Sequence, residues 1–490
     1  MKLEIELRLV EFKQVESKFV GITAVALLLV IAVMFGSART AGAQDSQPDR
    51  PVYVVQEGDS LWEIANRFGV SLDDLTSLNR ISDPNQVSAG TQLMIPGLEG
   101  IQGILTTKTV PYGENLRSLS RQYRVPTDIL ARLNHISSPE ELYAGYTLVL
   151  PESGSVVTDT SRAILNTGQS LLELSVLHDT SLWKVVGDNN LAGSWQALPG
   201  DPLLLSEQQN GGPGGLPGEI TGVEVSPLPL RQGKTSEIKV TGGGGLKLDG
   251  ALLGHKLNFF EDSAGSYVAL QGVHAMTESG LYPMTIRGTL EDTTPFTFTQ
   301  NIWVQAVDYP YDQPLTVNPT TIDPAVTRPE DAQWTALNEP VTPERFWFGD
   351  FKLPSPLGKN FCLETNECWS SKFGNRRSYN GSPYNAFHTG LDIVGGTGTK
   401  IFAPAPGVVV FAGPLTVRGN ATVIDHGWGV YTGYMHQSEI YVNPGDRVET
   451  GDVIGLVGGT GRVEGPHLHW EVWVGGVQVD PMDWLTTAYP

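Results

Sequence analysis

Basic residues are scarce in this sequence of 490 residues. Lysine and arginine number 32 against 53 aspartates and glutamates, which gives a formal net charge of −21. Nucleic-acid phosphates are bound through basic patches, so this balance argues against nucleic acid as a partner. It argues equally against electrostatic docking on anionic lipid or teichoic acid. Acidity keeps an exported protein soluble but does not identify a function.

Cysteine is almost absent. Cys362 and Cys368 are the only two, and five residues lie between them. No second cysteine or histidine pair stands near them, so a structural zinc site with four ligands is the less favoured interpretation. In an exported chain we expect a disulfide that closes this short loop.

The N-terminus carries an uncharged, mostly aliphatic run at residues 20–36. Its 17 residues reach the lower limit for a membrane-spanning helix. Ala41-Gly42-Ala43 follows and fits the small-x-small rule for signal-peptide cleavage. Residues 1–43 are therefore either a signal peptide or an uncleaved signal anchor. Both interpretations place the rest of the chain outside the cytoplasmic membrane and limit membrane contact to this segment.

A repeat with a period of 55 residues follows. Gly58-Asp59-Ser60-Leu61 recurs as Gly113-Glu114-Asn115-Leu116 and as Gly168-Gln169-Ser170-Leu171. The same step is kept near the end of each copy by Asn79, Asn134 and Asn189, and by Leu93, Leu148 and Leu203. Because the register holds at both ends of the unit, the repeat indicates a structural module.

Within the first copy, residues 52–55 and 92–95 favour strands, while Ser60 and Ser71 stand where they can cap two amphipathic helices. This β-α-α-β order, with the GDSL opening and Leu78-Asn79, resembles the lysin motif (LysM). The resemblance implies binding of glycans that contain N-acetylglucosamine, in a shallow groove between a helix and a strand-end loop. Spacer modules without a ligand are the alternative. We expect modules at residues 52–97, 107–152 and 162–206.

The third copy departs from the pattern. His178 stands where the other copies have an aromatic residue, Asp188 replaces a leucine, and Ser206 replaces a proline. The apolar positions that remain are sufficient for the same fold. Whether this degenerate copy binds sugar is left open by its sequence.

Residues 207–218 are rich in glycine and proline and are expected to form a flexible linker. From 219 to 307, short alternating apolar runs are separated by turn signals, which predicts an immunoglobulin-like β-sandwich. His255 and His274 occur singly there, which favours a surface or core role over metal binding. A second, proline-rich linker is expected at residues 308–340.

Histidines gather near the C-terminus, where five of the nine fall in the last 103 residues. His388 and Asp392 are four residues apart, and in an extended segment such side chains point the same way. His467 and His469 are two apart, so a strand presents both on one face. A catalytic zinc site needs three protein ligands and an open position for water, and these residue types can supply it.

The surrounding sequence matches a family pattern in chain order, with FGNR at 373–376, HTGLD at 388–392, APAPG at 403–407 and GPHLH at 465–469. It resembles the lysostaphin-like (LytM-type) zinc metallopeptidase family over residues 341–487. The resemblance implies an antiparallel β domain in which Zn2+ is held by His388, Asp392 and His469. It further implies that His436 and His467 are catalytic and flank the attacking water, and that His426 is structural. The sequence contains no HExxH, the motif of a different metallopeptidase class.

These interpretations combine into one prediction. The protein is expected to be multidomain and mainly β, with three small LysM modules, an Ig-like sandwich and a C-terminal zinc peptidase domain. It is expected to be exported and associated with the cell wall, where it hydrolyses peptide cross-links of peptidoglycan while LysM modules hold the glycan. The alternative is a catalytically inactive relative that regulates cell-wall amidases. That alternative normally accompanies loss of zinc ligands, whereas all five site residues are present here.

Overall fold

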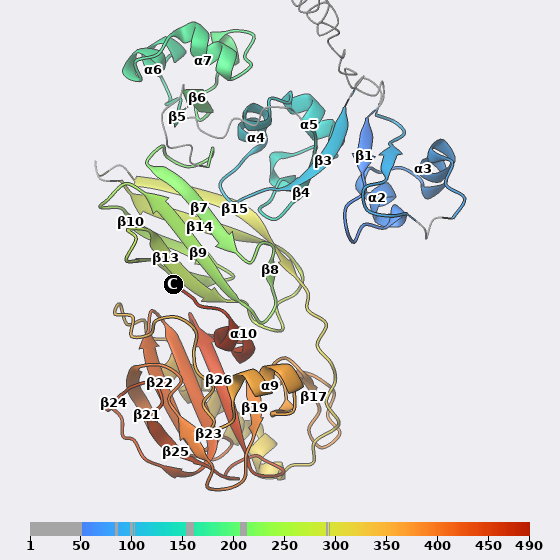
Figure 1. Ribbon diagram of the computed structural model, residues 1–490. Helices are drawn as coiled ribbons and strands as arrows, with labels where there is room; N and C mark the ends of the chain where they lie inside the picture. Colours follow the sequence, from blue (N-terminus) through green and yellow to red (C-terminus); the bar gives the residue numbers. More distant parts are fainter. Residues whose placement is uncertain are drawn as a thin grey trace, which may run out of the picture. The chain divides into compact units, whose positions relative to one another are not determined.

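The computed structural model describes residues 51–83, 87–98, 101, 103–152, 161–205, 213–290, 293 and 295–490 (Figure 1). The expected signal peptide or anchor at residues 1–43 lies outside these ranges. Within them, no helix is both long enough and apolar enough to cross a membrane. The chain divides into two compact units, residues 1–65 with 70–104 and residues 66–69 with 105–490.

The first repeat copy folds as a β-α-α-β module. Its elements are β1 (Val52–Val54), α2 (Leu61–Arg67), α3 (Leu72–Asn79) and β2 (Gln92–Met94), with β1 and β2 antiparallel. Ser60 Oγ accepts a hydrogen bond from the Glu63 amide at 3.2 Å, and Ser71 Oγ accepts one from the Asp74 amide at 3.0 Å. Both helices therefore begin at the serine caps expected from the sequence.

The second and third copies repeat this order, each around an antiparallel strand pair. The second copy comprises β3 (Ile104–Thr109), α4 (Leu116–Tyr123), α5 (Thr127–Leu133) and β4 (Thr147–Pro151). The third comprises β5 (Ser161–Ile164), α6 (Leu171–Leu177), α7 (Leu182–Asp188) and β6 (Pro202–Leu205). Short 3-10 helices at Pro139–Glu141 and Ser194–Gln196 precede the last strand of each.

The asparagine that recurs every 55 residues has the same structural task in each module. In the second copy, the Asn134 side chain donates to the carbonyls of Leu130 and Val149 at 2.9 and 2.7 Å, and accepts from the Val149 amide at 2.7 Å. Asn79 and Asn189 make the equivalent three bonds. The amide thus ties the end of the second helix to the closing strand.

Residues 220–305 form a sandwich of two sheets, as the alternating runs predict. One sheet has the order β11-β10-β14-β15-β8 and the other β12-β13-β9-β7. The strands are β7 (Ile220–Ser226), β8 (Leu230–Arg231), β9 (Thr235–Gly242), β10 (Lys247–Leu252), β11 (His255–Asn258), β12 (Phe260–Glu261), β13 (Tyr267–Gly272), β14 (Gly280–Thr289) and β15 (Pro295–Gln305). Buried aliphatic side chains such as Ile238, Leu257 and Ile302 fill the space between them.

The described end of the first expected linker, residues 213–218, is packed and not free. Leu216 is 3% exposed and belongs to the sandwich core. The Gly215 amide donates to the Gly113 carbonyl at 2.7 Å, and a Cβ on Gly214 would lie 2.2 Å from Cβ of Ser118. Gly214 and Gly215, read as a sign of flexibility, instead allow a close approach to neighbouring residues.

The second module is attached to the sandwich by buried polar contacts. Tyr112 donates its hydroxyl to the Met284 carbonyl at 3.0 Å. Gln300 accepts from the Gly113 amide at 2.8 Å and donates to the Glu114 carbonyl at 2.9 Å. As a result residues 112–114 are buried, although the corresponding Gly58 and Gly168 of the other copies are exposed.

The third module is attached to the second through ion pairs. Asp201 forms ion pairs with Arg117 at 2.6 Å and with Arg121 at 2.9 Å, and Arg162 forms one with Glu114 at 3.0 Å. Apart from Arg117, these side chains are at most 12% exposed. Breaking one partner of such a buried pair is costly, so the contacts fix how the two modules meet.

The C-terminal domain is built on a ten-stranded antiparallel sheet with the main order β16-β19-β26-β23-β22-β21-β24. Its strands are β16 (Trp369–Ser371), β19 (Leu391–Val394), β20 (Lys400–Phe402), β21 (Gly407–Leu415), β22 (Gly419–Gly427), β23 (Val430–Ile440), β24 (Arg447–Val448), β25 (Val453–Val457), β26 (His467–Val474) and β27 (Val477–Val479). A separate pair, β17 (Arg376–Arg377) and β18 (Ala386–Phe387), and helices α9 (Lys359–Thr365) and α10 (Pro481–Thr486) complete it.

The expectation that residues 308–340 form a linker is wrong, because they contain a helix packed on this sheet. Helix α8 (Pro324–Asn338) begins with Asp323 as its N-cap and Pro324 at the first helical position, where a missing N–H costs nothing. The Glu330 carboxylate accepts hydrogen bonds from the backbone amides of Thr416, Val417 and Arg418 at 2.7–2.9 Å. Trp334 is 1% exposed against the strands.

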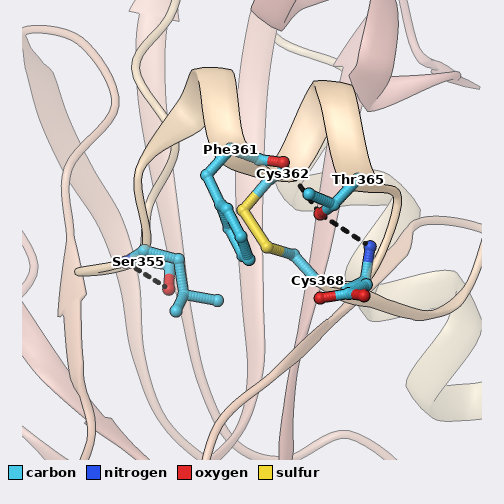
Figure 2. Close-up of a disulfide and its surroundings, with 7 residues drawn as sticks. Ser355, Phe361, Cys362, Thr365 and Cys368 are labelled. Carbon is cyan, nitrogen blue, oxygen red and sulfur yellow. Dashed lines mark hydrogen bonds between the residues drawn. A yellow bond between two sulfur atoms is a disulfide. The ribbon is translucent and has the colours of Figure 1, made fainter.

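A disulfide joins Cys362 in α9 to Cys368, with the two Cα atoms 5.2 Å apart (Figure 2). Both cysteines are buried in the core of the C-terminal domain. Within the closed loop, the Thr365 hydroxyl accepts a hydrogen bond from the Glu367 amide at 3.3 Å. The bridge fixes the chain immediately before β16.

The sandwich also contacts the C-terminal domain directly. Lys234 pairs with Asp480 at 3.0 Å and with Asp483 at 2.7 Å. The Trp484 indole donates to the Thr235 hydroxyl at 3.0 Å in a buried position. The sandwich is thus packed on α10 and is not a freely moving spacer.

Replacing Asn134 by alanine is expected to loosen the second module. One amide and two carbonyls lose a partner, and a buried polar group left unpaired costs about 1–3 kcal/mol. We expect the free energy of local opening, measured in the full chain by hydrogen–deuterium exchange across β3 and β4, to fall by about 2–4 kcal/mol. Asn79→Ala is the matched control, because it removes the equivalent three hydrogen bonds in the first module, where the asparagine is more exposed. Equal protection in the wild type and Asn134→Ala would contradict this role.

Candidate metal centre

Strand β26 has two chemically different faces. His467, His469 and Glu471 lie on one, while Leu468, Trp470 and Val472 lie on the other, in the hydrophobic core. The alternation follows from the period of two in a strand. One strand therefore carries polar groups into the site and is held by apolar burial behind it.

Neighbouring strand β19 brings the carboxylate to this face. It pairs antiparallel with β26, and Asp392 lies directly opposite His469. His388 lies between β18 and β19, three residues before β19 begins, and its side chain meets that of Asp392 as expected. Gly390 makes this route possible, since a Cβ there would lie 2.4 Å from the Trp470 carbonyl oxygen.

Three side-chain atoms meet at the centre of the site. His388 Nε2 lies 2.9 Å from Asp392 Oδ1 and 2.9 Å from His469 Nδ1, and His469 Nδ1 lies 2.7 Å from Asp392 Oδ1. All three residues are buried. Zinc ligands at 2.0–2.1 Å in tetrahedral geometry lie about 3.3 Å apart, so only a slight expansion is required. Two imidazole nitrogens and a carboxylate oxygen are a donor set that suits zinc.

The outward atoms of the same residues are already occupied. His388 Nδ1 donates to the Lys372 carbonyl at 2.9 Å, and Arg377 Nη2 donates to Asp392 Oδ2 at 2.9 Å. His469 Nε2 lies 3.3 Å from Glu471 Oε1. These partners select the tautomers in which the inward nitrogens carry lone pairs, as a metal requires.

Glu471 is itself a buried carboxylate with many donors. The indoles of Trp334 and Trp473 donate to Oε2 at 2.9 and 2.7 Å, and Thr389 and Gln478 donate to Oε1. Burial opposes ionisation, but the hydrogen bond and charge of His469 lower the pKa of Glu471 to about 2. The carboxylate is therefore ionised at neutral pH and fixes the His469 ring.

Burial and charge set the protonation of the three candidate ligands. Complete burial lowers the pKa of His388 to about 4, against the opposing charge of Asp392. Burial alone would raise the pKa of Asp392, but His388 and His469 lower it well below its usual range. Burial also lowers the pKa of His469, yet hydrogen bonds to Asp392 and Glu471 leave it raised overall. A cation at the centre would displace the proton that His469 retains.

Two further histidines face this centre. His467 Nε2 lies 3.5 Å from Asp392 Oδ1, and the ring of His436 lies 5.1 Å from that of His467 between centroids. In both residues Nδ1 is held by a backbone carbonyl, that of Gly465 at 2.9 Å for His467 and that of Thr460 at 2.8 Å for His436. Burial, reinforced by the neighbouring histidines, lowers the pKa of His436 well below its usual range. The structure thus brings all five predicted site residues together.

His426 does not join them. Its Nδ1 lies 2.7 Å from the Pro406 carbonyl and its Nε2 lies 2.8 Å from the Thr432 hydroxyl, in a fully buried position. Burial lowers its pKa to about 4. These contacts describe a neutral histidine within the core.

The centre opens into a cavity of about 1350 Å³. One wall comes from the C-terminal domain and includes Arg462 and Tyr379. The other includes Leu315 and Val317 from the segment before α8, and His274 and Met276 from the sandwich. A groove of this size accepts a peptide segment, and chain outside the C-terminal sheet shapes it.

Sequence reasoning assigned no role to Ser371, Arg377, Thr389 or Glu471, which contact the candidate ligands or their partners. Glu471 had a signal, because it continues the alternation of His467 and His469 on one strand. Ser371 and Arg377 had none, since only the β16–β19 and β17–β18 pairings bring them to the centre.

Comparison with known proteins gives two families. Residues 386–481 match the model for peptidase family M23, and residues 53–96 and 109–151 match the LysM domain. The chain thus contains an M23 (LytM-type) peptidase domain and two LysM domains.

Two curated relatives are similar over part of the chain. The peptidoglycan DD-endopeptidase ShyA of Vibrio cholerae is 42% identical over 113 residues, which are 23% of this chain and 26% of that protein. The DD-carboxypeptidase/endopeptidase Mpg of Neisseria meningitidis is 45% identical over 95 residues, 19% of this chain and 22% of that protein. The chain therefore matches about a quarter of the length of these relatives.

Among solved structures, a putative peptidase M23 from Pseudomonas aeruginosa is similar with a TM-score of 0.40 and 24% identity. The match covers 52% of this chain and 95% of that one.

The buried His426 predicts a measurable acid sensitivity. Its pKa is about 4 in the folded protein and 6.5 when unperturbed, so the unfolded chain binds the extra proton as pH falls between these values. Stability is then lost with falling pH, by roughly 3 kcal/mol from this residue. Urea unfolding of zinc-free protein at pH 7 and pH 4 should show a flatter pH dependence in His426→Gln. An unchanged slope would show that folded His426 is already protonated.

Proposed function

We propose that this protein is a zinc endopeptidase that hydrolyses peptide cross-links of bacterial peptidoglycan. The observation that carries the proposal is the buried set of His388, Asp392 and His469, faced by His436 and His467 at the end of an open groove. The matched family and the relatives named peptidoglycan DD-endopeptidases support the same chemistry.

His388 Nε2, Asp392 Oδ1 and His469 Nδ1 would hold the metal. These residues would give a bound zinc the setting in which it would supply an activated water, with the pKa of that water lowered from 15.7 to about 7. His436 and His467 each use Nδ1–H on a backbone carbonyl, so each presents the lone pair of Nε2. Two such acceptors can orient both hydrogens of the attacking water.

His467 is the more exposed of the two and is assigned as the base. It takes the proton of the water at Nε2 and later delivers it to the leaving amine. His436 has its Nδ1–H committed to the Thr460 carbonyl, so its Nε2 can accept a hydrogen bond from the water and orient it.

The LysM modules support a glycan-anchored substrate. Two modules on one chain raise the residence time on a polymer through effective concentration. The helix-entry loop of the first module is exposed, whereas that of the second is covered by the chain itself. We therefore assign glycan contact first to residues 52–97.

Export completes the proposal. Peptidoglycan lies outside the cytoplasmic membrane, and a disulfide such as Cys362–Cys368 persists in an oxidising compartment. The inactive regulator is the weaker alternative, because no ligand position has been replaced.

The five site residues should separate into two classes when changed. His388→Ala is expected to lose both bound zinc and cleavage, since it removes a ligand. His467→Ala is expected to keep zinc but lower the rate by about 10²–10⁴-fold, the usual range for a general base. Zinc content and new amine termini released from peptidoglycan by residues 44–490 measure the two properties. His255→Ala in the sandwich is the control, and full activity in His388→Ala would contradict the zinc assignment.

Removing residues 1–104 should separate binding from catalysis. We expect an at least tenfold loss of co-sedimentation with insoluble peptidoglycan, measured in the His388→Ala background to prevent digestion. In the active background, hydrolysis of a short soluble cross-linked peptide should stay within about twofold. Undiminished sedimentation would show that the first module does not anchor the protein.

A further inference from the structure

The segment before α8 runs alongside the metal centre. Tyr311 and Leu315 form isolated parallel bridges with Arg376 and Tyr379. Between them, the Asp312 amide donates to the Arg376 carbonyl at 2.9 Å, and Tyr384 donates its hydroxyl to the Asp312 carbonyl at 2.9 Å. The backbone of Asp312 is therefore fixed from two sides.

The Asp312 side chain is directed to residues that surround the candidate ligands. Its Oδ1 accepts from Asn375 at 2.7 Å, and its Oδ2 accepts from Ser371 at 2.9 Å and from Arg377 Nε at 3.3 Å. The carboxylate is 20% exposed and Arg377 is 14% exposed. Screening by water is limited there, so the pair interacts more strongly than one on the surface.

Two short chains lead from Asp312 to two of the three candidate ligands. Arg377 continues to Asp392, where Nη2 meets Oδ2 at 2.9 Å. Ser371 continues to His388, with Oγ 3.2 Å from Nδ1. If Ser371 donates to Asp312, its oxygen can accept from Arg377 Nη2 at 3.1 Å and serve as a second acceptor for His388 Nδ1–H, beside the Lys372 carbonyl at 2.9 Å. Both acceptors favour the tautomer that a metal at Nε2 requires.

We infer that Asp312 is a positioning residue for the zinc site. Without it, the Arg377 guanidinium would keep its ion pair with Asp392 alone and would compete with a divalent cation for that carboxylate. When Asp312 is present, it balances the positive charge of Arg377 and orients the guanidinium toward Asp392 Oδ2. Asp392 Oδ1 then remains available to a metal. Ser371 is held in the orientation that His388 needs.

This residue lies outside the stretch that matches the peptidase family, which begins at residue 386. The support for the metal centre thus comes partly from the chain that precedes the matched domain. The inference rests on the zinc site of the proposed function but is independent of the substrate.

The test is the zinc affinity of the full chain, measured by competition with a chromophoric chelator, in wild type and Asp312→Asn. We expect an affinity about tenfold lower in the variant, the lower end of the range for residues that support metal ligands. Cobalt(II) absorption spectra should shift in the variant, because the ligand field depends on ligand orientation. Thermal unfolding of the metal-free proteins shows whether the variant folds normally.

A double-variant cycle tests the route. If Asp312 acts mainly through Arg377, Asp312→Asn should have a much smaller effect on zinc affinity in an Arg377→Gln background. Asp331→Asn is the matched control, because Asp331 lies in the following helix α8 and also pairs with an arginine, Arg418, at 2.9 Å. Its zinc affinity should stay within about twofold of wild type.

Affinity within twofold of wild type in Asp312→Asn would overturn the inference. An equal loss in both backgrounds would overturn the route through Arg377 and support the one through Ser371. Lowered affinity that tracks a lowered unfolding temperature, with an unshifted cobalt spectrum, would also overturn the inference and leave a structural role. If the wild-type chain itself binds no zinc, the proposed function fails together with the inference.

Discussion

Asp392 and His469 meet because β19 and β26 pair antiparallel in a register that sets them opposite each other. The same pairing places Leu468, Trp470 and Val472 behind the site, where they are buried in the core. A slip of one residue would turn every side chain of β26 to the other face. The metal centre and the hydrophobic core thus depend on one register, and neither can be altered alone.

Burying this many ionisable groups is possible only because each has partners. An unpaired buried charge costs several kcal/mol, and a buried carboxylate is tolerated when donors surround it. Glu471 has two indoles, a hydroxyl and an amide, and Asp392 has an arginine that is itself balanced by Asp312. One of the indoles is that of Trp334 in α8, so the helix before the sheet completes the polar network.

The sequence predicted much of this arrangement and missed a definable part. The sequence carries local signals, which are the 55-residue period, the serine caps and the alternation of His467 and His469. Such local patterns are kept in the folded structure. The contacts of Asp312 and Trp334 join residues 59 to 137 positions apart, for which a single sequence has no signal. Proline and glycine suggested linkers at 213–218 and 308–340, because composition alone does not show that such a stretch packs on a neighbour or forms a helix such as α8. His388 lies beside Asp392 as the four-residue spacing suggested, although it stands outside the strands.

The sandwich has packed contacts with both the second LysM module, through Gln300, and the C-terminal helix, through Lys234. A domain joined by a flexible linker samples a broad volume, and the length of the linker then governs only how often the domain meets its target. A domain joined through a second, packed domain is instead held at a set distance. From residue 105 onward this protein belongs to the second kind, because the sandwich sets the spacing between the second LysM module and the C-terminal domain. Lengthening the sandwich would therefore change that spacing.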